Sequence, residues 1–168
     1  MPDITTLFLE YSRRKLVDEY WPRVRTSVES LTEEQVWWRP NEASNSVGNL
    51  LLHLNGNVRQ WLIASFNGVG DARNRPAEFA ERQVIPPAVL LRTLGETMEE
   101  AAAVLSRLTE ADLTRTVLIQ GYTVTGLDAV YHVVEHFGMH LGQILYVTKL
   151  VRGEGLGFYR ELDKTGRV

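Results

Sequence analysis

Four long segments of the chain show apolar residues at helical spacing, with polar and charged residues filling the positions between them. In the first segment, Val24, Val28 and Leu31 follow one another at steps of four and three. This spacing is typical of an amphipathic helix that turns one face toward a core. The pattern therefore predicts four helices, over about residues 5–31, 47–66, 88–108 and 126–152.

The residues at the ends of these segments support the helix limits. Asn67-Gly68 ends the second segment, Thr125 or Gly126 starts the fourth, and Gly153 stops it. Pro22 interrupts the first segment and predicts a kink or a break there, because proline removes one backbone donor.

The connections between the helices are longer than tight turns. Thr32 to Gln35 resembles a capping box and predicts a short helical turn. Residues 70–87 hold three prolines and form a long connection. Two β-prone runs in residues 116–125 flank Gln120-Gly121 and predict a small hairpin before the last helix. We therefore expect an all-α four-helix bundle and, since no linker or repeat is visible, one domain over residues 1–168.

Composition narrows the function classes. The chain has 168 residues, 44% of them hydrophobic, with a net charge of −3 and no run of basic residues, which argues against nucleic-acid binding. It has no cysteine, which excludes disulfides, thiolate metal sites and cysteine nucleophiles. Neither a secretory signal nor an apolar run of about 18 residues is present. We therefore expect a cytoplasmic protein with no membrane segment.

The histidines carry the main chemical signal. Three of the four, His132, His136 and His140, stand at i, i+4 and i+8 and share an arc of about 80° on a helix. Neighbouring imidazoles on one helix face can bind the same ion. The fourth, His53, lies in the middle of the second predicted helix and could complete the site from a facing helix. Gln143, about one turn beyond His140, could steady that ring or a bound water.

Histidines on an apolar face are more often hydrogen-bonded core residues than ligands, so packing without a metal is the alternative. Glu135 lies about 100° from His136, toward the predicted solvent face, and is not counted as a ligand. The sequence shows no clear general base, although Glu78 or Asp128 could serve.

Other side chains that attract attention have simpler interpretations. Trp37, Trp38 and Trp61 are expected to pack in the core or beneath loops instead of forming a ligand cage. Arg73, Arg75 and Glu78, in the long connection, could cover a site, but we favour solvation for them.

Several motifs resemble the DinB-like superfamily of four-helix metal-binding proteins, which includes the YfiT-like hydrolases, and within it a branch of uncharacterised bacterial proteins. The resemblance extends from Phe8 to Tyr159. It rests on residues 37–41 (WWRPN), 45–53 (NSVGNLLLH), 56–61 (GNVRQW), 73–79 (RNRPAEF) and 132–143 (HVVEHFGMHLGQ).

The resemblance implies an up-down-down-up bundle, often a homodimer, with a metal triad of His53, His136 and His140. The usual arginine after the last histidine is replaced by Leu141 here. His132 matches a further histidine that is frequent in this superfamily but is not normally a metal ligand. The resemblance therefore implies that His132 either supports a ligand from outside the coordination shell or contacts the substrate. Zinc or nickel fits best, with iron or manganese as alternatives.

Relatives of this type include transferases and isomerases that use a low-molecular-weight thiol such as bacillithiol or mycothiol. We therefore expect a metal-dependent enzyme acting on a small molecule, either a thiol transferase or a hydrolase. Three imidazoles leave an open position on the ion for a thiolate or a water. The alternative is a non-catalytic metal-binding or stress-related protein with a structural ion.

Overall fold

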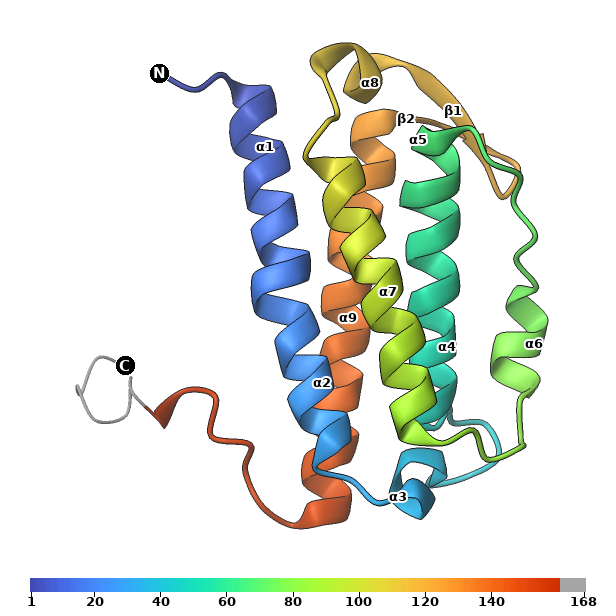
Figure 1. The fold of residues 1–168 in the computed structure, drawn as a ribbon. Coiled ribbons are helices and arrows are strands. Elements are labelled where there is room, and N and C mark those ends of the chain that lie inside the picture. The colour runs from blue at the N-terminus through green and yellow to red at the C-terminus, as the bar shows by residue number, and fades with distance from the viewer. Residues whose placement is uncertain (161–168) are drawn as a thin grey trace.

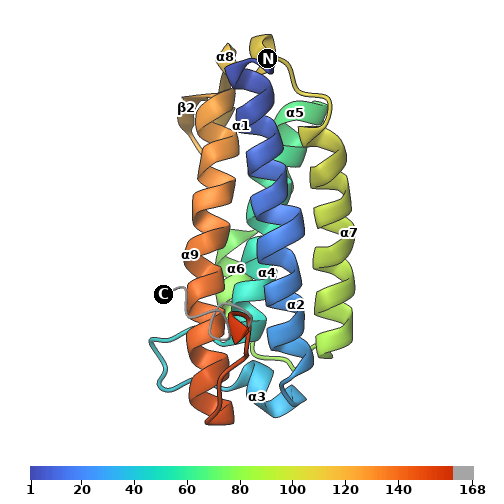
Figure 2. The ribbon, with the colours of Figure 1, turned by 90° about the vertical axis from the view of Figure 1, so that its left-hand side faces the viewer.

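The structure, a computed structural model that describes residues 1–160, contains four long helical rods packed side by side (Figure 1). The second and third rods run parallel to each other and antiparallel to the first and fourth, which is the up-down-down-up order (Figures 1 and 2). The predicted all-α bundle is confirmed. The first rod consists of α1 (Ile4–Arg13), η1 (Arg14–Tyr20) and α2 (Trp21–Glu29). The second rod consists of α4 (Val47–Val58), η2 (Arg59–Ala64) and α5 (Ser65–Asn67). The third rod is α7 (Pro87–Leu105), and the fourth is α9 (Gly126–Arg152).

Pro22 neither breaks nor ends the first rod. It occupies the first turn of α2, directly after the π-helical segment η1. Proline is tolerated in the first turn of a helix, where its missing donor costs little. The proline therefore marks a change of helical winding within one continuous rod.

Short elements lie in the connections: α3 (Glu33–Trp37), α6 (Arg75–Ala80) and α8 (Glu110–Thr114), with the strands β1 (Thr116–Ile119) and β2 (Tyr122–Thr125). The strands pair antiparallel, with Ile119 opposite Tyr122. Gln120 and Gly121 between them have φ angles of 54° and 81°, as a two-residue turn of the mirror-image type requires. The predicted hairpin and its turn are confirmed.

Capping boxes begin the two rods that carry the histidines. The hydroxyl of Ser46 accepts from the backbone N–H of Asn49, and Thr125 does the same for Asp128. Hydrogen bonds from the Thr125 side chain and backbone lower the pKa of Asp128. Asp128 is thus an exposed capping residue, and nothing in its contacts supports a role as a general base.

The core fills the space between the rods with aliphatic side chains and one fully buried phenylalanine, Phe137. Trp37 and Trp61 pack as predicted, and the indole of Trp37 donates to the carbonyl of Ile85 at 3.0 Å. Trp38 differs, because it lies at the surface with 38% of its area exposed.

No helix within residues 1–160 is long and apolar enough to cross a membrane. Residues 161–168 lie outside the part of the chain that the structure describes.

Candidate metal centre

Three histidines meet in the seam between α4 and α9. His53 comes from α4, and His136 and His140 come from successive turns of α9. The Nε2 atom of His136 lies 3.0 Å from that of His53 and 3.2 Å from that of His140. For a tetrahedral ion with bonds of about 2.05 Å, neighbouring ligand atoms stand about 3.3 Å apart. The spacing of the three nitrogens therefore fits one divalent ion.

The other ring nitrogen of two of these histidines is held by an oxygen acceptor. His53 Nδ1 lies 2.8 Å from Glu78 Oε2, and His140 Nδ1 lies 2.6 Å from Gln143 Oε1. A carboxylate or amide oxygen can only accept, so these contacts place the proton on Nδ1 in both rings. Arg73 Nη2 also lies 3.1 Å from His53 Nδ1, but both nitrogens can donate to Glu78 Oε2, the acceptor that they share. The lone pair on each Nε2 then points to the centre, which is the tautomer that a metal requires.

Burial keeps His136 and His140 uncharged. Burial, followed by the neighbouring charges of His140 and His53, lowers the pKa of His136 to about 3. Burial also lowers the pKa of His140, although the hydrogen bond to Gln143 opposes this shift. Neutral imidazole is the form that binds metal, so the site needs no deprotonation of His136 or His140 at neutral pH.

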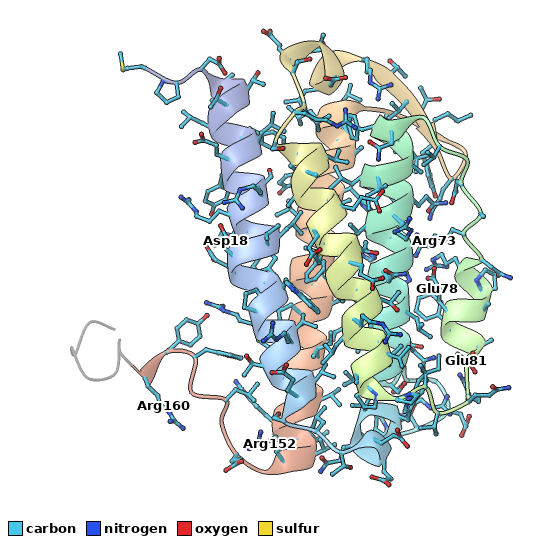
Figure 3. The ribbon with its side chains drawn as sticks, in the orientation of Figure 1. Asp18, Arg73, Glu78, Glu81, Arg152 and Arg160 are labelled. Atoms are coloured by element: carbon cyan, nitrogen blue, oxygen red, sulfur yellow. The ribbon has the colours of Figure 1, made fainter. Side chains whose placement is uncertain are left out.

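Arg73 and Glu78, which we expected to be solvated, are buried against His53, with only 4% and 11% of their side chains exposed. The guanidinium holds the carboxylate with both Nε and Nη2, at 2.7 and 2.9 Å (Figure 3). Burial raises the pKa of Glu78, but the hydrogen bonds from Arg73 and His53 outweigh it and leave the pKa lowered. The solvation prediction is wrong for this pair because each charge satisfies the other. Arg75, by contrast, is exposed.

The short helix α6 carries Glu78 to the centre. The Asn49 amide donates to the carbonyl oxygens of Glu78 and Glu81, at 2.9 and 3.1 Å, and so fixes α6 to the start of α4. On the same helix, the ring of Phe79 lies 4.5 Å from that of His53. Figure 3 shows Arg73 and Glu78 reaching from the connection toward α4.

The hairpin also contacts this network. Arg73 Nη1 donates to Gln60 Oε1 at 2.9 Å, and the amide of Gln120, in the hairpin turn, donates to the same oxygen. A chain of polar contacts thus runs from the hairpin through Gln60, Arg73 and Glu78 to His53. Two connections far apart in sequence, the hairpin and the segment between α5 and α7, thus contribute to the orientation of one imidazole.

Gly56 provides the space for the ion pair. A Cβ at this position would stand 2.0 Å from Glu78 Oε1 and 2.8 Å from Arg73 Nε. We expect Gly56→Ala to push Glu78 off His53, to weaken metal binding about tenfold to a hundredfold, and to lower the melting temperature. Chelator competition and thermal unfolding would measure the two effects.

Gly142→Ala is the matched control, because this exposed α9 glycine has nothing within 4 Å of an added Cβ. It should leave metal affinity unchanged and stabilise the helix by up to about 1 kcal/mol. If both variants bound metal as the wild type does, the ion pair would not be needed to hold His53.

His132 lies outside the three-histidine group. Its ring centroid is 5.2 Å from that of His136, and its Nε2 atom is 3.1 Å from Asn57 Nδ2. The rings of His132 and Trp61 are tilted by 33° against each other, with centroids 3.9 Å apart. Glu135 is exposed, as the helical spacing predicts. Leu141, which takes the place of the arginine usual in similar proteins, is buried in the core.

The fold and the histidine arrangement define the class: a four-helix bundle protein with a candidate three-histidine centre. The match to a family model is more specific. The chain belongs to the family described as "Protein of unknown function (DUF1572)", whose model matches residues 3–158.

Solved structures agree on the fold. A conserved protein from Enterococcus faecalis superposes with a TM-score of 0.72 at 19% identity, over 92% of this chain and 100% of the other. A DinB-like protein, YjoA from Bacillus subtilis, gives a TM-score of 0.63 at 23% identity, over 83% of this chain and 91% of the other. None of the curated proteins compared with the chain matches its sequence.

Proposed function

We propose that this protein binds one divalent metal ion through His53, His136 and His140 and acts as a metal-dependent enzyme on a small molecule. The observation that carries the proposal is the convergence of three Nε2 atoms, two of them set in the metal-binding tautomer by Glu78 and Gln143. Zinc or nickel suits three imidazoles best, and iron or manganese stays an alternative.

The reaction we propose is thiol transfer or hydrolysis. A bound ion with three protein ligands supplies Lewis acidity and lowers the pKa of a thiol or water that binds to it. The residues of this chain contribute orientation: Glu78 and Gln143 hold two of the ligand rings, and Arg73 holds Glu78. The buried surroundings of His136 strengthen electrostatic interactions at the centre.

Cobalt-substituted protein would test for an open coordination position. We expect added 2-mercaptoethanol to produce a thiolate-to-cobalt absorption band in the wild type but not in His136→Ala. The same zinc-loaded pair should then be compared in thiol transfer to 1-chloro-2,4-dinitrobenzene, where a C–S bond forms, chloride leaves and the thiol proton passes to solvent. A His136→Ala protein that kept both metal and activity would contradict the proposal.

The second candidate is a non-catalytic protein with a structural ion. The close contact between α4 and α9 at the centre favours it, since an ion there would tie two rods together. It predicts no thiolate band and a large fall in melting temperature when the metal is removed.

The single domain, the cytoplasmic location and the homodimer stay predictions. Exposed apolar side chains along α9, Tyr131, Met139, Tyr146 and Leu150, support the homodimer.

A further inference from the structure

A second cluster of polar and aromatic side chains continues the seam beyond the histidine centre. Asn57 and Trp61 follow His53 at i+4 and i+8 on the second rod, and His132 precedes His136 by four residues on α9. Because the two rods run antiparallel, Asn57 and Trp61 meet His132 across the seam. We name Asn57, Trp61 and His132 the Asn57 cluster.

The Asn57 cluster holds buried polar atoms that have no partner. Within residues 1–160, four buried side-chain polar atoms have no hydrogen-bond partner. Three of them lie in or beside the cluster: Asn57 Oδ1, Trp61 Nε1 and His136 Nδ1. Asn57 and Trp61 are only 3% and 7% exposed. Leaving such a group unpaired in the interior costs about 1–3 kcal/mol. Their concentration beside the proposed metal centre points to a ligand that pairs with them.

The chemistry of these atoms favours an acceptor on the ligand. Trp61 Nε1 can only donate. His136 Nδ1 carries the proton whenever Nε2 faces an ion, so it donates as well. Rotation of the Asn57 amide would let Oδ1 accept from His132 Nε2 and leave Nδ2 free to donate, because the two amide orientations are equivalent in shape.

The charge balance favours an anion. Arg73 and Glu78 form an ion pair and neutralise each other. A bound divalent ion would therefore leave the buried region with its full positive charge. A negatively charged ligand offsets a buried charge of this kind.

We infer that the Asn57 cluster is a binding subsite for the carboxylate of a small-molecule ligand held beside the ion, with Trp61 Nε1 as a donor to one carboxylate oxygen. The inference rests on the proposed metal site and adds the ligand class. Asn57 and Trp61 are positioning residues here. His132 supports Asn57 through a hydrogen bond and Trp61 through a tilted ring contact.

Propionate, with propionamide as its neutral analogue, would test the subsite on zinc-loaded protein. Trp61→Phe keeps an aromatic ring beside His132 and removes the indole N–H donor together with one of the two indole rings, as the control substitution at Trp38 also does. We expect this variant to bind zinc as the wild type does and propionate about ten- to a hundredfold more weakly, as the loss of one hydrogen bond to a charged group predicts. Trp38→Phe, at the exposed tryptophan, is the matched control and should leave both affinities unchanged.

The indole N–H resonance of Trp61 gives a readout that packing alone would not move. Propionate should shift this resonance in the wild type and leave that of Trp38 in place. An unshifted Trp61 resonance, equal propionate affinity in Trp61→Phe, or equal binding of propionamide would each overturn the carboxylate subsite. Zinc content is measured first on the same samples. A wild type without zinc would contradict the metal site and the subsite together, whereas zinc without Trp61-dependent binding contradicts the subsite alone.

Discussion

Untagged His53→Ala protein is expected to purify with less than about a tenth of an equivalent of metal, whereas the wild type carries one equivalent. His53 is the one proposed ligand from α4, so its loss leaves only the neighbouring pair on α9. Binding at a four-coordinate site is worth about 12 kcal/mol, and removal of one of three protein ligands forfeits roughly a third of it. That loss of about 4 kcal/mol corresponds to about a thousandfold in affinity. Elemental analysis of both proteins would measure it.

His132→Ala is the matched control for this experiment. It removes a partly buried imidazole from the same seam, one turn from His136, but outside the three-histidine group. We expect it to keep one equivalent of metal. If neither the wild type nor any variant took up metal, even after reconstitution, the histidines would be packing residues. If His132→Ala lost the metal as His53→Ala does, the ligand set would be wrong.

Much of the fold could be predicted because local sequence rules determine it. The rods follow from apolar periodicity, and the starts of α4 and α9 follow from Ser46 and Thr125 with their capping partners. The hairpin follows from the two β-prone runs that flank Gln120-Gly121, and Gly121 suits the positive φ angle at its position in the turn. Each of these features involves residues close together in sequence, so one chain without relatives is enough to predict it.

The histidine row on α9 is local in the same sense, and helical spacing alone brings His136 and His140 together. The addition of His53 depended on the resemblance to a known family and on the general architecture of bundles. A pairing 83 residues apart cannot be read from spacing. The contacts of Asn57 and Trp61 with His132, which underlie the proposed carboxylate subsite, were not predicted, although each residue follows His53 at a whole number of four-residue steps along the same helix face.

The Arg73–Glu78 pair was misjudged for a physical reason. Charged residues in a connection rich in proline are usually solvated, and no periodicity marks which of them turn inward. One signal was present: Asn74 caps α6 and Pro76 stands in its first turn, as at many helix starts. That start predicts a short helix bearing Glu78. Its approach to His53 depends on the long-range bonds from Asn49 and on the space at Gly56.

The ion pair gives the second large expected effect. Glu78→Gln should destabilise the metal-free protein by about 3–5 kcal/mol, because it leaves the guanidinium of Arg73 buried, at 4% exposure, without its counter-charge. It should also weaken zinc binding about tenfold to a hundredfold, since a neutral amide holds the His53 Nδ1 proton less strongly than a carboxylate does. Urea unfolding and chelator competition would measure the two losses.

The double variant Arg73→Met with Glu78→Gln separates these two roles. With no uncompensated charge left in the interior, it should regain most of the lost stability. Zinc affinity should stay low, because His53 still lacks its carboxylate partner. Recovery of both properties would mean that Glu78 serves only to neutralise Arg73, and recovery of neither would mean that the pair holds α6 in place by packing. Recovery of stability alone is the result expected if the pair orients a metal ligand.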